Sequence, residues 1–354
     1  MMLHCQKEVS LATLNTFGVA AKARVLWRLE HEADLAPLRE ALQSGSSRPL
    51  PLVLGGGSNL LLTGDLDEPV IQVALRGRRI VSETPETVVI EAAAGEAWDG
   101  LVDWTLAQGL CGLENLALIP GSVGAAPIQN IGAYGVEQCE RFESLTAFDL
   151  TTGVMRRFEA AACQFGYRRS FFKSAEGSRW LVTSVRYRLS RRPAPRLGYQ
   201  ALAEALQARG LTAPTADEIA QTVRTIRRSK LPDPQVLGNA GSFFENPILP
   251  PDQAQALQAH HPSLPHWPTA EGQVKVSAAW MIDQCGWKGF REGDAGVHAQ
   301  HALVLVNYGS ASGADLLALA RRISASVEGR FGVRLRPEPV IAGPLRWTSA
   351  HPVP

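Results

Sequence analysis

Ser242 has surroundings that suit a proton donor. It lies among small residues and beside two phenylalanines in the segment GNAGSFFENP, residues 238–247. A hydroxyl in such a place can face a ligand in a dry pocket, although a lone serine in a turn more commonly caps its own backbone. No nucleophile-elbow GxSxG surrounds it, and no acyl-transfer triad can be assembled from the sequence. Proton donation therefore fits better than covalent attack.

Two charged residues accompany this serine as candidates for chemistry. Arg168 follows Gly166-Tyr167, and a guanidinium suits bidentate pairing with a carboxylate or a phosphate. Glu338 lies between two prolines, which fix the position of its carboxylate, although a loop glutamate in that setting can simply be solvated. His298 and His301 have no third ligand at helical spacing, so no metal site is predicted.

Two glycine-rich segments indicate a ligand cradle. Residues 119–135, IPGSVGAAPIQNIGAYG, contain no charged residue, whereas a plain surface loop is usually polar and shorter. Glycines let a backbone approach a ligand, and consecutive N–H groups can bind an anion. A second cluster, GGGSN at 55–59, follows a short apolar strand. Two such loops suit a dinucleotide pyrophosphate, yet no GxGxxG follows a predicted strand, so a Rossmann site is not indicated.

Strands and helices must position these residues. Strands are predicted over residues 23–29, 51–54, 70–75, 87–94, 145–150, 155–159 and 180–189, and helices over 32–43 and 98–108. Beyond the basic, proline-rich residues 191–196, helices are predicted from Thr215 through Ile226, over 277–285 and over 314–330, with a strand at 301–307. The pattern predicts an α+β fold with a strand-rich first domain and a smaller second domain, divided between Arg191 and Thr215.

Composition excludes several classes of protein. The chain has 354 residues, which suggests two or three domains, and 45% of these residues are hydrophobic, which is typical of a well-packed globular protein. Its net charge of +1 indicates no general affinity for nucleic acid or membranes. Its five cysteines are scattered and form no CxxC pair, so neither a zinc knuckle nor a disulfide framework is indicated. No signal-peptide or membrane-spanning stretch is found, and we expect a cytoplasmic protein.

Seven segments in chain order resemble those of the UDP-N-acetylenolpyruvoylglucosamine reductase family, from about Asn15 to Gly343. They are NTFGV (15–19), GGGSN (55–59), IPGSVGAAPIQNIGAYG (119–135), GYRRS (166–170), SKLPDP (229–234), GNAGSFFENP (238–247) and PEPVIAG (337–343). The resemblance implies an FAD-binding domain of the vanillyl-alcohol-oxidase type at 15–195 and a smaller α+β substrate-binding domain at 211–343. It further implies an NADPH-dependent flavoenzyme that reduces UDP-N-acetylglucosamine enolpyruvate to UDP-N-acetylmuramate in peptidoglycan biosynthesis.

The resemblance also implies roles for individual residues. Arg168 would polarise the substrate carboxylate, Ser242 would supply a proton with help from a neighbour such as Lys230, and Glu338 would act as an acid or orienting group. Residues implied to contact the substrate are Tyr167, Tyr199, Lys230 and Asn246. Residues implied to bind FAD noncovalently are Gly55, Gly56, Gly57, Ser58, Asn59, Pro120, Gly121, Ser122, Gly124, Ala125, Ile131, Gly132 and Ala133.

Two residues depart from the family pattern. Glu245 replaces a common lysine and His301 stands where glutamine is often found, and we expect these changes to affect nucleotide affinity and not the reaction type. Two other functions remain open: a flavin oxidase or dehydrogenase acting on an alcohol or hydroxy acid, and a non-catalytic UDP-sugar-binding protein. A monomer whose partners are NADPH and the UDP-sugar substrate is expected.

Overall fold

The computed structural model describes residues 3–43, 50–269 and 271–347, which form two compact units. The first unit contains the chain up to Val9, Ala23–Gly56 and Glu68–Ser229. The second contains Ser10–Lys22, Gly57–Asp67 and the chain from Lys230 onward. Both units mix helices and strands, which confirms the predicted α+β class.

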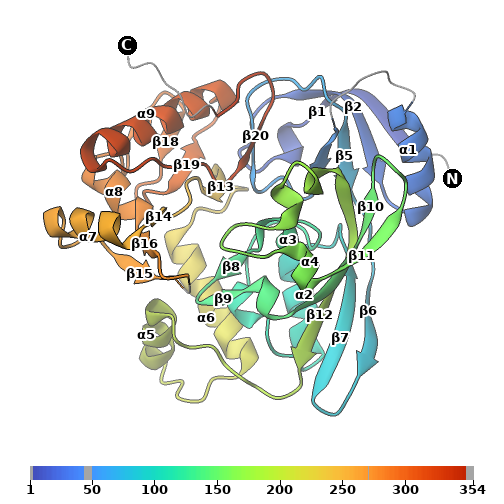
Figure 1. Ribbon diagram of the computed structural model, residues 1–354, viewed down its shortest axis with the longest axis horizontal. Helices are drawn as coiled ribbons and strands as arrows, with labels where there is room; N and C mark the ends of the chain where they lie inside the picture. Colours follow the sequence, from blue (N-terminus) through green and yellow to red (C-terminus); the bar gives the residue numbers. More distant parts are fainter. Residues whose placement is uncertain (1–2, 44–49, 270, 348–354) are drawn as a thin grey trace. The chain divides into compact units, whose positions relative to one another are not determined.

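The first unit is built on two main sheets. One has the order β1-β2-β5-β3, in which β2 (Lys22–Leu29) and β3 (Leu52–Leu54) both run parallel to β5 (Val70–Val73), and β1 is His4–Ser10. The other is antiparallel and has the order β11-β10-β12-β7-β6, with the long arrows of β12, β7 and β6 side by side in Figure 1. Its strands are Met155–Glu159, Phe142–Asp149, Trp180–Ser190, Thr87–Ala93 and Arg78–Glu83, in that order.

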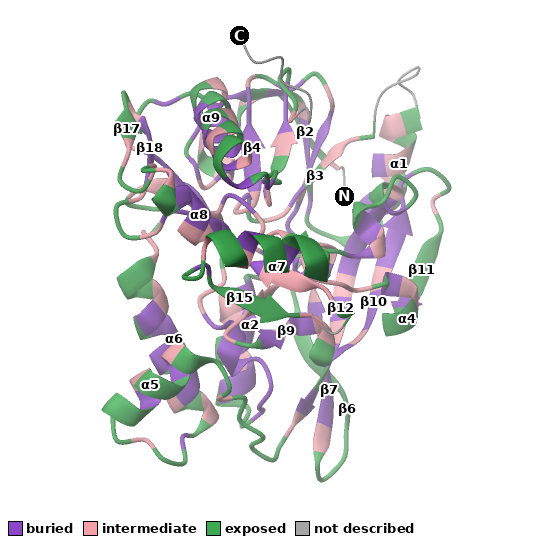
Figure 2. Ribbon diagram, turned by 60° about the vertical axis from the view of Figure 1, so that its left-hand side comes forward, coloured by how far each residue is buried: buried purple, intermediate pink, exposed green. Residues whose placement is uncertain are grey.

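Helices complete the core of the first unit. The apolar spacing of Ile219, Val223 and Ile226 predicts a helix, and the structure has α6 at Ala216–Lys230 with these residues buried. Figure 2 shows the resulting alternation of buried and exposed stretches along α6. They join one hydrophobic cluster with Trp98 and Leu101 of α2 (Trp98–Ala107), and a fully buried side chain of this size contributes about 1.5–3 kcal/mol. The remaining helices are α1 (Leu35–Gln43), α3 (Ala126–Gln129), α4 (Ala160–Cys163) and α5 (Gln200–Ala208).

Because α6 packs with the first unit up to Ser229, the compact units divide the chain later than the change of pattern between Arg191 and Thr215. Two early segments, Ser10–Lys22 and Gly57–Asp67, also belong to the second unit. The ranges 15–195 and 211–343 therefore remain predictions about domains.

Over the residues that the structure describes, the second unit holds smaller sheets and three α-helices. Its main sheet has the order β13-β19-β18-β17, a second has the order β14-β16-β15, and β20 runs parallel to β4. The strands are β4 Leu60–Leu62, β13 Gly238–Ser242, β14 Ile248–Leu249, β15 His266–Pro268, β16 Val274–Val276, β17 Arg291–Glu292, β18 Ala295–Val297, β19 Val304–Asn307 and β20 Val340–Ala342. The helices are α7 Pro251–His260, α8 Ala278–Gln284 and α9 Gly313–Phe331.

The caps explain where the helices of this unit begin and end. Ser312 caps α9 by accepting a 3.2 Å hydrogen bond from the N–H of Asp315, and Gly332 ends the helix with a positive φ of 66°. Ser277 accepts a hydrogen bond from the N–H of Trp280 at the start of α8. Both helices were predicted from the sequence, and both are confirmed.

Candidate functional site

Gly55 and Gly56 of the shorter glycine-rich segment meet the longer segment within the first unit. A Cβ at Gly56 would lie 2.9 Å from Cα of Gly121, and one at Gly124 would lie 2.5 Å from Cβ of Ala94. A Cβ at Gly55 would clash with the side chain of Ser122. Neighbouring protein atoms thus occupy the space that a Cβ would need at these three glycines, where we had expected a ligand. Glycine at positions 55 and 56 lets the two segments meet, and glycine at position 124 lets the long segment approach Ala94.

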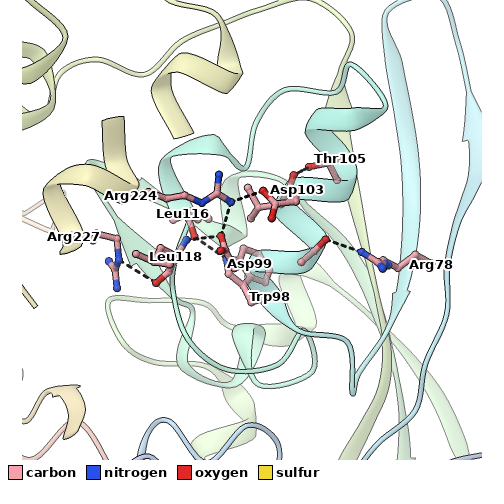
Figure 3. Close-up of polar contacts among 11 residues, drawn as sticks. Arg78, Trp98, Asp99, Asp103, Thr105, Leu116, Leu118, Arg224 and Arg227 are labelled. Atoms are coloured by element: carbon pink, nitrogen blue, oxygen red, sulfur yellow. Dashed lines mark hydrogen bonds and ion pairs between the residues drawn. The ribbon is translucent and has the colours of Figure 1, made fainter. Parts of the chain in front are cut away.

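The first turn of α2 holds the start of the long segment (Figure 3). Trp98 Nε1 donates a 2.9 Å hydrogen bond to the Leu116 carbonyl, and the Trp98 N–H donates one of 3.0 Å to the Gly121 carbonyl. Asp99 Oδ1 accepts a 2.6 Å hydrogen bond from the Leu118 N–H. Leu118 has a φ of 57°, a left-handed conformation that costs free energy for a non-glycine residue. These contacts fix the backbone immediately before Pro120 and Gly121.

Two arginines of α6 reach the same turn. Arg224 is buried, and its Nη2 donates to Asp99 Oδ1 at 2.8 Å and to Asp103 Oδ1 at 2.5 Å. Burial lowers the pKa of Arg224, but its hydrogen bonds and ion pairs with the two aspartates raise it by more. The net result is a pKa above the ordinary value of arginine. Arg227 Nε donates a 3.2 Å hydrogen bond to the Leu118 carbonyl. These arginines were not predicted as site residues, although their i,i+3 spacing beside the buried stripe of α6 was a signal.

Arg168 lies against the second half of the long segment. Its turn is closed by paired backbone hydrogen bonds between Gly166 and Arg169, and Arg168 itself has a φ of 52°. Arg168 Nη2 donates to the Gly132 carbonyl at 3.2 Å, and its guanidinium lies 5.2 Å from the Tyr167 ring centroid. The structure thus brings together Tyr167, Arg168 and the short strand β8 (Gly132–Ala133), which pairs with β9 (Val136–Glu137).

Tyr199 contacts the end of the same segment. It precedes α5, is 46% exposed, and packs its ring edge-on against Tyr134 with centroids 5.2 Å apart. Burial raises the pKa of the Tyr134 phenol, while the charge of Arg227 opposes the rise and Tyr199 adds to it. The two tyrosines and Arg227 are therefore electrostatic neighbours.

Ser242 ends strand β13 in the second unit. A break in register between Asn239 and Ser242, with Gly241 at a φ of 69°, turns the strand before Ser242 pairs with Val304. Within the described part of the chain, no protein group hydrogen-bonds the Ser242 hydroxyl. Ser242 is thus not a turn serine that caps its own backbone. The amide of Asn239 ties this strand to the SKLPDP loop by donating to the Pro232 carbonyl at 3.1 Å.

Glu338 and Asn59 lie beside the Ser242 strand. The Glu338 N–H donates a 2.8 Å hydrogen bond to the Phe243 carbonyl, next to Ser242. Asn59 Nδ2 donates to the Glu338 carbonyl at 3.3 Å. One backbone and one side-chain hydrogen bond therefore place three expected site residues on adjacent segments of the second unit.

The other expected substrate residues have mixed surroundings. Asn246 Oδ1 accepts a 3.0 Å hydrogen bond from the Ala278 N–H, so part of its amide holds the start of α8. Lys230, the last residue of α6, is exposed. Burial lowers the pKa of His301, and the nearby charges of His298, Lys230 and Lys288 lower it further.

Neither a metal cluster nor a membrane span emerges from the described ranges. No three His, Cys, Asp or Glu side chains there are grouped to hold a metal ion. Over the same residues, every helix is too short or too polar to cross a membrane.

Comparisons with known proteins decide what this arrangement belongs to. A family model described as the C-terminal domain of UDP-N-acetylenolpyruvoylglucosamine reductase matches residues 233–342, and one described as an FAD-binding domain matches residues 28–159. The chain is 54% identical to the UDP-N-acetylenolpyruvoylglucosamine reductase of Pseudomonas aeruginosa over 96% of its own length and 99% of that protein. The chain belongs to the UDP-N-acetylenolpyruvoylglucosamine reductase family.

Two further relatives agree with this assignment. The reductase of Paraburkholderia xenovorans is 55% identical over 92% of the chain and 94% of that protein. The crystal structure of the Thermus caldophilus reductase superposes with a TM-score of 0.63 at 27% identity, covering 96% of this chain and 98% of that one. The expected fold, an FAD-binding domain of the vanillyl-alcohol-oxidase type followed by a smaller α+β domain, is confirmed.

Membership of the reductase family also confirms the expected cofactor and reaction class. The chain is an FAD-dependent oxidoreductase of peptidoglycan synthesis with NADPH as its reductant. The first unit fits such a cofactor, because its long glycine-rich segment has a guanidinium group near each end. Arg168 contacts Gly132, and Arg227 contacts the Leu118 carbonyl two residues before Pro120. An uncharged ring system linked to a pyrophosphate needs both features.

Proposed function

We propose that the protein reduces UDP-N-acetylglucosamine enolpyruvate to UDP-N-acetylmuramate, and that Ser242 gives the proton that completes the reduction. The observation that carries this proposal is the Ser242 hydroxyl, which no protein group in the described chain engages and which lies next to the backbone that holds Glu338. When bound, FAD supplies the hydride relay between NADPH and the enolpyruvyl carbon.

The charged residues act on the substrate carboxylate. Negative charge develops beside that carboxylate as hydride adds, so a cation aimed there stabilises the transition state. Arg168 is suited to this role because the Gly132 carbonyl orients its guanidinium. Glu338, held between two prolines, orients the substrate or relays a proton to Ser242.

The remaining residues bind the cofactor and the nucleotide. Tyr167, Tyr199, Lys230 and Asn246 contact the UDP-sugar. Residues 55–59, 120–122, 124–125 and 131–133 bind FAD without a covalent bond. The domain ranges 15–195 and 211–343 belong to the same proposal. A cytoplasmic monomer is part of the same proposal. The net charge of +1 supports only the expectation that the protein has no general affinity for nucleic acid or membranes.

The test is NADPH oxidation by the FAD-loaded protein, measured with and without UDP-N-acetylglucosamine enolpyruvate. Oxidation should depend on the enolpyruvyl substrate, and UDP-N-acetylmuramate should accumulate in equal amount. Oxygen-dependent turnover of a hydroxy acid, without NADPH oxidation, would instead indicate an oxidase. A protein that takes up no FAD on incubation would indicate a non-catalytic UDP-sugar-binding role.

A further inference from the structure

Two arginines one turn apart on α6 are paired very differently. Arg224 forms ion pairs with both Asp99 and Asp103, at 2.8 and 2.5 Å. Arg227 forms no ion pair with any residue in the part of the chain that the structure describes. Its single hydrogen bond there runs from Nε to the neutral Leu118 carbonyl at 3.2 Å. The charge on Arg227 is therefore left without a carboxylate partner of its own.

The surroundings of Arg227 make an unpaired charge costly. The side chain is only partly exposed, and a guanidinium remains charged at every pH at which proteins are folded. Burial lowers the pKa of Arg227 and the like charge of Arg168 lowers it too, whereas Tyr134 and Asp99 raise it. Asp99 gives little relief, because its Oδ1 already accepts hydrogen bonds from Arg224 and from the Leu118 N–H. Buried charges in proteins are normally compensated.

Three neighbours of Arg227 belong to the candidate site. Leu118 lies two residues before Pro120 at the entrance to the glycine-rich segment, and Arg168 and Tyr134 line its other end. Figure 3 shows the remaining guanidinium nitrogens of Arg227 directed away from Arg224 and its carboxylates. A second cation thus accompanies Arg168 at the cradle.

We propose that Arg227 is an anion-binding residue of this site, whose terminal nitrogens bind an oxyanion of the bound FAD or of the enolpyruvyl substrate while Nε holds the Leu118 carbonyl. The chemistry is the same from either source, a phosphate or carboxylate oxygen that neutralises the guanidinium. The identity of the two ligands rests on the proposed function, whereas the existence of the anion-binding site does not.

Three variants separate the charge from the backbone contact. Arg227→Gln removes the charge but keeps a donor for the Leu118 carbonyl, and Arg227→Lys keeps the charge. Arg228→Gln is the matched control, because Arg228 is the next residue, is exposed and has no partner in the described chain. FAD is titrated into the deflavinated protein, and the enolpyruvyl substrate is titrated into the FAD-loaded protein, with flavin fluorescence and absorbance as readouts.

Arg227→Gln should weaken the binding of FAD or of the enolpyruvyl substrate, raising that dissociation constant by at least about tenfold. This is the usual effect of losing a charged hydrogen bond. Arg227→Lys should recover part of the loss, and Arg228→Gln should match the parent. A loss confined to FAD identifies the cofactor as the source of the oxyanion, and a loss confined to the enolpyruvyl substrate identifies the substrate. Unchanged dissociation constants with a lowered melting temperature overturn the inference. If the parent binds FAD but shows no substrate-dependent NADPH oxidation, the proposed function fails while the FAD titration still decides the role of Arg227.

Discussion

Asp99 and Leu118 are joined by a 2.6 Å hydrogen bond from the backbone N–H of Leu118 to Asp99 Oδ1. The same oxygen accepts a hydrogen bond from buried Arg224. One carboxylate therefore fixes Leu118, a left-handed residue just before the glycine-rich segment, and compensates a charge on α6. The segment before Pro120 is therefore tied to a helix more than a hundred residues away in the sequence.

Replacing Asp99 by Ala should lower the stability of the first unit by about 2 kcal/mol, because it leaves Arg224 less compensated and the Leu118 N–H without its acceptor. Thermal unfolding followed by circular dichroism, with retention of FAD after gel filtration, measures the effect. Asp103→Ala is the matched control. The Asp103 side chain is 63% exposed against 30% for Asp99, so the loss should be smaller. Equal losses would show that Asp99 acts only through Arg224.

Ser242→Ala should leave FAD bound and reducible by NADPH, since that step needs no proton from Ser242. Reoxidation of the flavin by the enolpyruvyl substrate should slow by at least about a hundredfold, as for other positioned acids. Rapid-mixing absorbance separates the two steps. The melting temperature should not change, because no protein group in the described chain hydrogen-bonds this hydroxyl.

Ser242→Cys serves as the conservative comparison and should retain more activity than Ala, because a thiol can still donate a proton. If the Ala variant reoxidises at the parental rate, the proton comes from elsewhere, and Glu338 is the next residue to replace.

Periodicity predicted the elements that bury a continuous stripe. Helices α6 and α9 were predicted because their apolar residues recur at helical spacing. A capping residue also marks an end of each helix in the sequence, Thr215 for α6 and Gly332 for α9. Strand β6 was not predicted because all six of its residues are exposed, so no alternation marks it. Helices α5 and α7 bury only two residues each, which is too weak a stripe to read from the sequence.

The candidate site was predictable where a motif is local. A motif of a few residues was enough to pick out the glycine-rich segments, Ser242 and Glu338. The structure places Ser242 and Glu338 on adjacent segments. The network of Asp99, Arg224 and Arg227 was missed because it joins helices far apart in the chain, and no local pattern tells which carboxylate meets which arginine. The role of the glycines could be predicted only in part from the sequence. They also allow another part of the backbone to pass close by, and this is a tertiary contact that no local pattern reveals.

Tyr199→Phe should weaken binding of the enolpyruvyl substrate by roughly five- to tenfold, because one hydroxyl contact to the nucleotide is lost. The phenylalanine ring keeps the edge-on packing against Tyr134, so folding should be unaffected. Reduction of FAD by NADPH should proceed at the parental rate. Tyr199→Ala, which also removes the ring contact, is the comparison. An equal loss in both half-reactions of the Phe variant would mean that Tyr199 has a general structural role.

The stability of the protein should fall below about pH 6.5 partly because of His301. Burial and nearby cations hold the pKa of His301 below its ordinary value, so the unfolded chain binds a proton more readily than the folded one. The contribution of neutral His301 is complete above about pH 6.5 and is lost as the pH falls from there to the lowered pKa. His301→Gln should flatten this part of the profile, measured as urea midpoints between about pH 7.5 and 5.

The His298→Gln variant is the control for His301→Gln, because His298 is a second titrating histidine in the same turn. Burial lowers its pKa as well, but His298 is one of the groups that depress the pKa of His301. His298→Gln should therefore remove a smaller part of the slope, and should raise the pH at which His301 takes up its proton. A His301→Gln variant whose urea midpoint falls with pH as steeply as the parent would show that other groups set the acid limit of this fold.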